Sequence, residues 1–488
     1  MPGLLKFFLI LSVILIAAPA LASDTGKAAQ AAGFANSSSA HPAPAAQSFA
    51  NSSSAKGSPS LIKLPPAPHA VAPSTTPPAS AKAMTLEDCM AIALGDHPRI
   101  KGAEEDVDFG QFRTIGAAAA YFPQITFDAN RNWINSSRPI HIGGQNITTK
   151  ANYVANTWGF NGNWTLFDFG RTYYSVKSNK ELETALKKTL TNVQENVVYD
   201  IRDAFFSLLR AQTLVQVAEE TLDQANSHLR QAQAFYDAGV KPRYDVTTAE
   251  VEVNNAKVQI IQAYDSVTQA RINLNTRMTV NPTTGTVVVD RPALEPLDKT
   301  LDQYLAASVE NRPDIQSLES QRKANEIATK GALAGFLPTI TASGSYTWYK
   351  EDTTDAFASD NYQIAIDVPI FQGFATVAQV GQARAAALSS KYRVEDAKLN
   401  VLNDVASAYL SVQDAKARTV ALEVSVQKAK ENLDIAQGRY EAGVGNIIDV
   451  TDAQVLLTTA KTDKAQAYYD YHLAYSKLLR STGVGVVQ

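Results

Sequence analysis

The stretch that decides the fold runs from Gly170 to Gly239 and reads GRTYYSVKSNKELETALKKTLTNVQENVVYDIRDAFFSLLRAQTLVQVAEETLDQANSHLRQAQAFYDAG. The 68 residues between these two glycines include neither glycine nor proline. Apolar side chains recur there at steps near three and four, namely Leu182, Leu186, Leu190, Val193, Val197, Ile201, Phe205, Leu208 and Val215. This spacing predicts one helix over 171–238 with a coiled-coil seam along one side. At about 1.5 Å per residue such a helix is roughly 100 Å long, which is typical of a tube and not of a catalytic domain.

The chain contains the same arrangement twice. Residues 85–133 align without a gap on residues 300–348, an offset of 215, and 14 of the 49 pairs are identical. Further along, residues 236–240 match 440–444 at an offset of 204. Two halves built alike should share one architecture and be related by pseudo-symmetry.

Each half predicts a short helix, a helix of medium length, a hairpin, a very long helix and a returning helix. Proline in the first turn of each medium helix, and again at its end, supports these boundaries. The first repeat covers 83–290, with a hairpin at 123–168, a long helix at 171–238 and a return helix at 243–281. The second repeat covers 291–488, with a hairpin at 338–371, a long helix at 374–442 and a return helix at 446–482. The first hairpin is the longer one, and we place its extra residues at the tip, around Asn135 to Ala151.

The hairpins alternate apolar and polar residues with a period of two. The apolar sets are Val154, Trp158, Phe160, Trp164 and Leu166 in the second strand, Ile340, Ala342, Tyr346 and Trp348 in the third, and Tyr362, Ile364, Ile366, Val368 and Ile370 in the fourth. The first strand follows the rule except for Arg131 on its apolar side. A half-buried soluble sheet alternates in the same way. Four such strands with Trp and Tyr near their ends, in a chain that begins with a secretion signal, favour transmembrane barrel strands instead.

Four strands are too few to close a barrel, for which about eight are needed. An open sheet edge is not tolerated in lipid. We therefore predict that the chain oligomerises, with more than two copies for a wide aqueous pore.

Residues 1–22 are typical of a secretory signal peptide. Lys6 precedes an apolar run from Phe7 to Ala18, and Ala20-Leu21-Ala22 forms a small-residue cleavage site. A membrane-spanning helix needs about 20 apolar residues, and this run is shorter. We therefore favour a cleaved signal peptide over an uncleaved membrane anchor. From 23 to 82 the chain is rich in Ala, Ser and Pro and cannot bury a core, so we predict a disordered tether.

Composition argues against several classes of function. The net charge of -4 becomes -5 once Lys6 leaves with the signal (43 basic minus 48 acidic), and there is no basic stripe, so we expect no nucleic-acid partner. The six histidines lack metal-ligand spacing. The sequence contains no nucleophile elbow and no phosphate loop, so we predict no enzyme activity, no metal and no cofactor. The single cysteine, Cys89, is interpreted as a small apolar residue on a short helix.

Two further motifs carry a family resemblance. Residues 164–171 read WTLFDFGR, and residues 440–453 read YEAGVGNIIDVTDA, with an echo, YDAGVKPRYDVTTA, at 236–249. Both resemble the signature of the TolC family of outer membrane efflux proteins, and the resemblance extends from about Thr85 to the C-terminus.

The resemblance implies a mainly α fold with transmembrane β structure. A long α-helical coiled-coil barrel would cross the periplasm, and four β-strands per chain would join a shared, twelve-stranded outer membrane barrel of a homotrimer embedded in outer membrane lipid. It also implies that a periplasmic adaptor (membrane fusion) protein docks at the helix tips, together with an inner membrane RND or ABC transporter. Gly239, Val240, Gly443 and Val444 fall on those adaptor-docking tips.

The resemblance further implies a periplasmic gate in which an acidic residue faces a tyrosine, with two aspartates ringing the entrance. These roles fall on Asp245, Tyr440, Asp449 and Asp452. Gly445 stands where the family usually has a basic residue, and Tyr244 replaces an expected polar neighbour.

Simpler roles are open for these residues. Asp245 and Asp449 fall in the first turn of a return helix, where an acid offsets the helix dipole or caps free N–H groups. Gly239 and Gly443 suit helix C-terminal caps that need a positive φ.

These observations favour one function over two alternatives. The leading hypothesis is an outer membrane exit duct of a tripartite efflux system, which passively conducts small molecules exported by an inner membrane pump. The first alternative is the exit duct of a type I protein secretion system. The second, from another class, is a periplasmic coiled-coil scaffold without a pore.

Overall fold

The computed structural model describes residues 83–142, 145–289, 293–352 and 355–483. The predicted signal peptide (1–22) and tether (23–82) lie outside the described residues.

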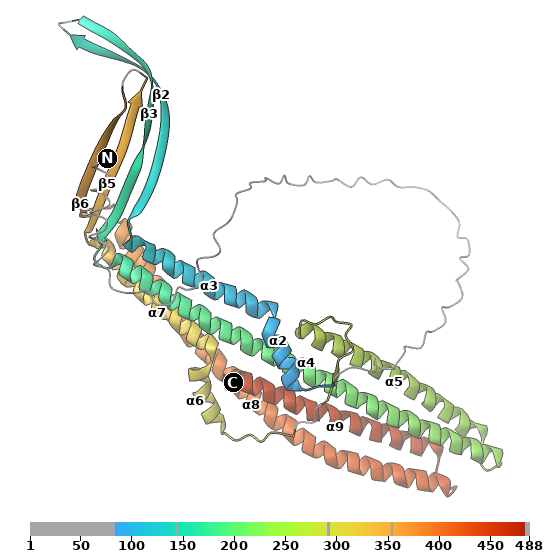
Figure 1. The fold of residues 1–488 in the computed structure, drawn as a ribbon. Helices are drawn as coiled ribbons and strands as arrows, with labels where there is room; N and C mark the ends of the chain where they lie inside the picture. The colour runs from blue at the N-terminus through green and yellow to red at the C-terminus, as the bar shows by residue number, and fades with distance from the viewer. Residues whose placement is uncertain (1–82, 143–144, 290–292, 353–354, 484–488) are drawn as a thin grey trace, which may run out of the picture. The chain divides into compact units, whose positions relative to one another are not determined.

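Within the described residues, each half of the chain contains four α-helices and one hairpin in the same order (Figure 1). In the first half these are α2 (Leu86–Asp96), α3 (Pro98–Ala118), β2 (Gln124–Ile142), β3 (Gln145–Phe167), α4 (Arg171–Asp237) and α5 (Arg243–Arg277). In the second half they are α6 (Leu301–Asn311), α7 (Pro313–Leu333), β5 (Thr339–Glu351), β6 (Phe357–Asp367), α8 (Ala375–Glu441) and α9 (Ile447–Thr482). A single 3-10 turn, η2 (Ala119–Tyr121) or η3 (Ala334–Phe336), leads from each medium helix into its hairpin. The internal duplication seen in the sequence is thus a duplication of structure.

Helices α4 and α8, with 67 residues each, organise the helical part. Helix α4 packs against α3 and α7 along its first part and against α5 and α9 along its last part. Helix α8 packs mainly on α7 and α9, and the short helix α6 lies on it as well. The strands and the turns between long and return helices therefore lie at opposite ends of the long helices (Figure 1).

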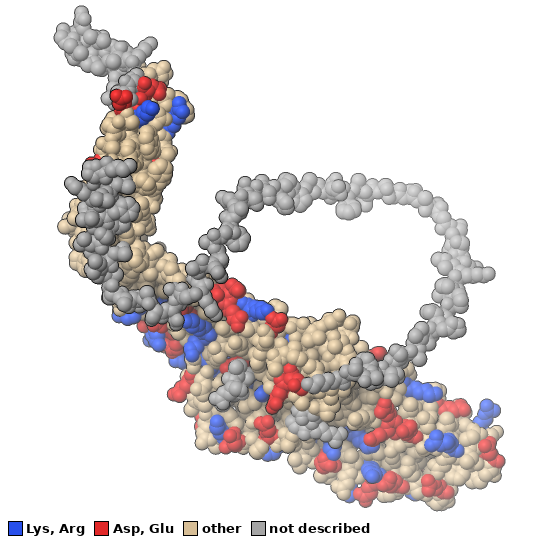
Figure 2. Space-filling model, viewed as in Figure 1, with Lys and Arg blue, Asp and Glu red and all other residues tan. Residues whose placement is uncertain are grey.

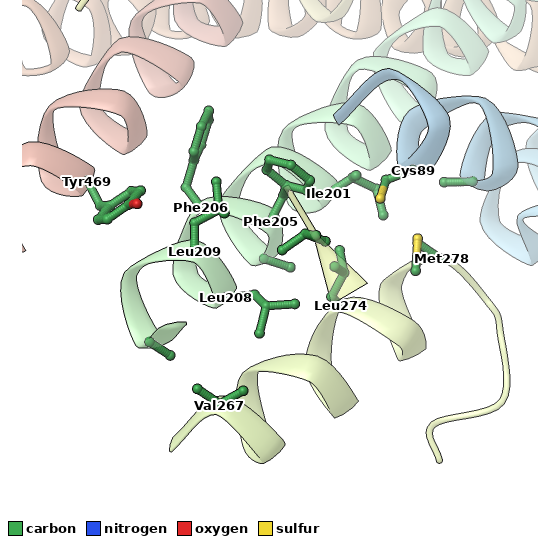
Figure 3. Close-up of a cluster of buried hydrophobic side chains, with 14 of the residues drawn as sticks. Cys89, Ile201, Phe205, Phe206, Leu208, Leu209, Val267, Leu274, Met278 and Tyr469 are labelled. Carbon is green, nitrogen blue, oxygen red and sulfur yellow. The ribbon is translucent and has the colours of Figure 1, made fainter. Parts of the chain in front are cut away.

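The predicted seam of α4 lies at the centre of the largest hydrophobic cluster (Figure 3). Ile201, Phe205 and Leu208 are completely buried against Leu274 of α5 and Tyr469 of α9. Cys89 joins the same cluster from the short helix α2, the kind of element on which the sequence placed it, and is fully buried. Burial raises the pKa of the Cys89 thiol to about 11, so the side chain stays protonated and packs as an apolar group.

The end of the WTLFDFGR motif, residues 164–171, forms the junction between β3 and α4. Phe169 and Gly170 both have positive φ values, of 53° and 94°, and together they turn the chain from strand into helix. The Asp168 carboxylate accepts hydrogen bonds from the backbone N–H groups of Gly170 and Thr172, which would otherwise lack partners at the helix start. The second repeat turns in the same way at Gly373 and Phe374, with φ of 57° and 67°.

The structure departs from the predicted boundaries in two places. Helix α5 ends at Arg277, before the predicted end at Asn281, because Thr279 takes a φ of 59° that no helix accommodates. Strand β6 ends at Asp367, not at 371, and Pro369 downstream has no N–H to donate to a neighbouring strand.

Two very short strands were missed in the sequence. Strand β1 (Ala83–Met84) pairs in parallel with β4 (Val287–Val288), and so joins the start of the first repeat to the segment that follows α5.

The four long strands form one antiparallel sheet in the order β2-β3-β5-β6. Strand β3 pairs with β5 only as far as Ala155. Beyond that point β3 pairs with β2 alone, from Val154 opposite Trp133 to Gln145 opposite Ile142. The extra length of the first hairpin therefore lies at its tip, as the sequence predicted.

Candidate functional site

One face of the sheet is largely apolar on all four strands, with Arg131 on β2 and Asp360 on β6 as charged exceptions. The register places Phe127 opposite Phe160, and Phe160 opposite Tyr346. Farther along, Ala342 lies opposite Ile364. This apolar face is uncovered, since 72% of Ile364 and 74% of Trp133 are exposed. A single chain therefore presents to its surroundings a sheet face that should not remain in water.

A bulge modifies the predicted alternation at one point. The register of β3 shifts between Thr165 and Phe167, so that Phe167 lies opposite Ile340. Leu166, which the alternation placed on the apolar face, falls at this bulge.

The opposite face of the sheet is polar. Thr126, Asn161, Ser345 and Asn361 form one row across the four strands, and they line a hollow of about 360 Å³. Asp128 lies on the same face and accepts a hydrogen bond from the Asn161 amide at 2.7 Å. The polar residues predicted on separate strands thus come together on one continuous hydrophilic surface, the polar face.

Charged groups are sparse over the middle of the sheet. In Figure 2 its visible surface is mostly uncharged, whereas Lys, Arg, Asp and Glu gather at its far end and along the helices. The apolar side of β5 carries no charged residue from Ile340 to Trp348. This uncharged span is similar in length to a transmembrane strand, which needs about 9–11 residues. Arg131, the predicted exception, lies with its guanidinium 5.5 Å from the ring centroid of Trp133, which suits a charge at the edge of a membrane.

The turns at the other end of the long helices bring the remaining candidates together. Gly239 and Gly443 have φ values of 74° and 81° and close the ends of α4 and α8, as predicted for C-terminal caps. Val240 and Val444 follow them and are exposed. We call these two turns, 238–242 and 442–446, the first and second tip.

A buried hydrogen bond connects two helices that flank the tips, α8 before the second tip and α5 after the first. The Tyr440 hydroxyl donates to Asp245 Oδ2 at 3.0 Å, with only 1% of Tyr440 and 6% of Asp245 exposed. The ring of Phe235 meets the Tyr440 ring edge-on at 5.6 Å. Burial, and then the hydrogen bond and charge of Asp245, raise the pKa of Tyr440, so the hydroxyl remains a donor throughout the physiological range.

A lysine that the sequence analysis missed completes this contact. Lys241, in the first tip, donates from Nζ to the Gly445 carbonyl oxygen at 3.1 Å, and Nζ lies 4.9 Å from the centroid of the Tyr440 ring. The offset of 204 between the repeats makes Lys241 the equivalent of Gly445. A Cβ on Gly445 would lie 2.8 Å from the Tyr440 nitrogen, so this position has no space for a side chain. The basic group therefore reaches the second tip from the first.

In the internal repeat, Tyr236 corresponds to Tyr440 and Asp449 corresponds to Asp245, and this second pair does not form the same contact in the described structure. Tyr236 is 42% exposed and Asp449 is exposed as well, and the described residues show no hydrogen bond between them. The tips are thus connected asymmetrically, through Tyr440 and Asp245.

Asp449 and Asp452 lie one turn apart on an exposed side of α9, and the described structure gives neither an ion-pair partner. The cap of α9 is Asn446, whose side chain accepts from the Ile448 N–H at 3.2 Å. Asp449 therefore does not serve as the side-chain cap of this helix. Tyr244, on α5, is also exposed and points to no described partner.

Within the described ranges, no group of three or more His, Cys, Asp or Glu residues has the arrangement of a metal site. The described helices also include none that is both long and apolar enough to cross a membrane.

Comparison with protein families gives one clear match. The model of the outer membrane efflux protein family matches residues 91–278 and 305–484, which together make up more than half of the chain.

Individual relatives are distant in sequence. The chain is 25% identical to the alkaline protease secretion protein AprF of Pseudomonas aeruginosa, over 82% of this chain and 85% of that protein. It is 23% identical to the outer membrane protein TolC of Vibrio cholerae, over 65% of this chain and 75% of that protein.

Solved structures share the fold. The outer-membrane channel OprN matches with a TM-score of 0.73 and 20% identity, over 85% of this chain and 99% of that one. The outer membrane protein VceC of Vibrio cholerae matches with a TM-score of 0.71 and 18% identity, over 82% of this chain and 97% of that one.

Proposed function

Because the chain belongs to the outer membrane efflux protein family, a family of transport channels, we propose that it forms the outer membrane exit duct of a tripartite efflux system. In this role it passively conducts small molecules that an inner membrane pump delivers through a periplasmic adaptor. The observation that carries the proposal is the two-faced sheet, with the exposed apolar face toward lipid and the polar face toward water. A periplasmic scaffold without a pore would have no use for either face.

The working unit is a homotrimer in this proposal. One chain supplies four long strands, and the sheet has two open edges, β2 and β6, that lipid would not tolerate. Three copies would supply twelve strands, enough for an aqueous barrel. Exposed apolar side chains along α8, including Leu388, Leu399 and Leu410, support burial against a second copy.

The tips are the proposed docking site for the adaptor. Val240 and Val444 are exposed beside Gly239 and Gly443, whose lack of side chains leaves the turns smooth. An inner membrane RND or ABC transporter would complete the assembly and supply the energy.

The tips also form the proposed gate. Tyr440 and Asp245, with Lys241, hold the two helix pairs of one protomer together, and opening would require these contacts to break. Asp449 and Asp452, in three copies, would ring the entrance with carboxylates and favour cations there.

One observation favours a second candidate, the exit duct of a type I protein secretion system. The similarity to AprF, a protease secretion protein, covers 82% of this chain, whereas the similarity to the toluene efflux pump outer membrane protein TtgC of Pseudomonas putida covers 60%. A strain lacking this chain distinguishes the two, because an efflux duct leaves it sensitive to toxic small molecules and a secretion duct leaves it unable to release a protein.

A matched pair of strand variants tests the proposed membrane insertion. Ile364→Arg places a charge on the apolar face, where a charge at mid-bilayer costs about 2–4 kcal/mol. Gln363→Arg places the same charge on the polar face, one residue away. We expect Ile364→Arg to deplete assembled oligomer severalfold in outer membrane fractions, and Gln363→Arg to leave it unchanged. Equal amounts of both variants, or a parent protein that fractionates with soluble periplasmic proteins, would argue for the scaffold.

A further inference from the structure

A titratable pair of side chains lies inside the helical part of the molecule, close to the tips. His228 on α4 is 4% exposed, and the side chain of Glu252 on α5 is 12% exposed. His228 Nδ1 lies 3.9 Å from Glu252 Oε1. Glu252 is two turns along α5 from Asp245, so the pair is a neighbour of the proposed gate without being part of it.

Each member of the pair contributes a buried atom that lacks a hydrogen-bond partner in the described structure. These atoms are His228 Nδ1 and Glu252 Oε1, the same two atoms that lie 3.9 Å apart. This separation is too long for a hydrogen bond but short enough for a strong interaction between charges. The charge of one group therefore depends on the charge of the other, and the two titrate as a pair.

The remaining polar atoms of the pair reach the helices of the second repeat. His228 Nε2 lies 2.7 Å from the amide nitrogen of Gln437 on α8. Glu252 Oε2 accepts a hydrogen bond of 3.4 Å from the hydroxyl of Thr451 on α9. An amide N–H donates, so Nε2 accepts, and a proton on Nε2 would require the Gln437 amide to turn over. Because both bonds run from α4 and α5 to α8 and α9, the charge of the pair acts on the contact between the two helix pairs.

The pair has to balance its own charge. The charged residues within three positions of His228, Glu252, Gln437 and Thr451 are all exposed, and they are Arg230, Glu250, Asp434, Arg439, Asp449 and Asp452. The remaining titratable neighbour, Tyr440, is buried and donates to Asp245. An unbalanced charge in a buried site is costly, so the arrangement is most stable when the summed charge of the pair is zero.

The directions of the pKa shifts agree with this balance. Burial lowers the pKa of His228, which disfavours the charged imidazolium. Burial raises the pKa of Glu252, and the hydrogen bond from Thr451 opposes that shift only in part. A neutral histidine beside a protonated carboxyl has a summed charge of zero.

We propose that His228 and Glu252 bind one proton between them while the two helix pairs are in contact, and that gaining a second proton or losing the first loosens that contact. The pair would act as a pH-sensitive device beside the proposed gate, and it rests on that gate for any effect on conduction.

The direction of the pH dependence follows from counting protons. Once the contact is open, the two groups would return to their ordinary pKa values of 4.5 and 6.5, and between these values they also bind about one proton. Below this range the open form binds more protons than the closed form, so falling pH favours opening. Above the range the open form binds fewer protons, so rising pH favours opening as well. The contact should therefore be strongest near the middle of the range.

The first test measures the separation of the tips against pH in the purified full-length protein. A bimane dye is attached through Val240→Cys, and Val444→Trp supplies a quencher, at exposed positions of the two tips. Cys89 is fully buried and should not react with the dye. We expect the unquenched fraction, resolved by fluorescence lifetime, to be smallest near pH 5.5 and to rise severalfold toward about pH 4 and about pH 8. The labelled Val240→Cys protein without the tryptophan corrects for any effect of pH on the dye.

Two variants separate the acid and alkaline limbs of this profile. Glu252→Gln leaves only the histidine, so the tips should still separate in acid but no longer toward pH 8. His228→Gln leaves only the carboxyl, so the tips should still separate with rising pH but no longer in acid. Glu250→Gln removes an exposed carboxylate from the same helix and should follow the parent. As a second readout, carbon-13 NMR of labelled histidine should show the His228 signal, identified by its loss in His228→Gln, titrating below its ordinary pKa of 6.5.

Three results would overturn the proposal. A parent profile that is flat, or that changes in one direction only, would mean that the pair does not bind a single proton in the closed contact. Limbs that persist in both variants would assign the pH dependence to other groups, such as Asp245. A His228 signal that titrates at or above its ordinary pKa would contradict a neutral, buried ring. Neither readout uses conductance, so a protein without a pore would still decide this proposal, and its failure would leave the proposed channel function standing.

Discussion

Combining Tyr440→Phe with Asp245→Ala should convert a resting, nearly closed channel into one that leaks. The hydrogen bond between these side chains is buried and involves a carboxylate, and such bonds contribute about 1.5–3 kcal/mol. A change of 1.4 kcal/mol corresponds to a factor of ten in an equilibrium constant. Loss of this hydrogen bond should therefore raise the ratio of open to closed states roughly 10- to 100-fold for each protomer that carries the variant. Single-channel recordings in planar bilayers would register this as a larger resting conductance, and cells would take up more of an otherwise excluded antibiotic.

Companion variants separate the gate from simple destabilisation. Tyr440→Phe alone should also leak, because it leaves the Asp245 carboxylate buried without a donor. Lys241→Met keeps the apolar stem but removes the ammonium from the Gly445 carbonyl, and should give a smaller leak of about fivefold. Tyr236→Phe, the equivalent change in the first repeat, alters an exposed tyrosine and should conduct like the parent. If the double variant also conducts like the parent, Asp245 and Tyr440 are structural residues and the gate lies elsewhere.

Replacing Asp449 and Asp452 by Ala should remove most of the cation preference of the channel. Both carboxylates are exposed on α9 without a described ion-pair partner, so in a trimer six negative charges would lie around one constriction. The permeability ratio of K⁺ to Cl⁻ should fall severalfold toward unity, and the effect should be strongest at low salt, where screening is weakest. The measurement is the reversal potential in a KCl gradient, which should move toward zero.

A control for the aspartates removes the same number of charges from a distant place. Glu104 and Asp108 are exposed on α3, which packs on the first part of α4 and so lies away from the tips, and their replacement by Ala should leave the reversal potential unchanged. An unchanged potential in the Asp449 and Asp452 variant itself would remove these residues from the entrance.

Local patterns in the sequence predicted the regular elements well. The stretch without glycine or proline after Gly170 defines α4 because helix interiors exclude those two residues, and alternation with a period of two defines the faces of the sheet. The positive φ of Gly239 and Gly443 could be anticipated because a helix that ends in a tight turn favours a residue without a side chain.

Features that depend on distant segments were not predicted. The pairing of β1 with β4 involves two residues on each side and gives no periodic signal. The early end of α5, a local feature, was not predicted either: Thr279 takes a positive φ, and the Asn275 amide donates to the Pro282 and Thr284 carbonyls beyond the helix.

The role of Lys241 follows only when both tips are placed together. The internal repeat held a usable signal, since the offset of 204 puts Lys241 opposite Gly445, the position at which the family resemblance implied a basic residue. The buried polar side chains of Glu252, His228 and Gln454, each with an atom that lacks a hydrogen-bond partner in the described structure, had no such signal, because each of these residues is common on the polar side of an ordinary helix.

The most direct test of the channel itself is the single-channel conductance of the detergent-purified parent protein in planar bilayers, with a KCl gradient across the membrane. A trimeric duct closed at an acidic entrance predicts small, cation-preferring conductance steps that grow when the contact between Tyr440 and Asp245 is removed. An absence of steps from folded, oligomeric protein, with the parent and the Tyr440→Phe, Asp245→Ala variant alike, would contradict a pore.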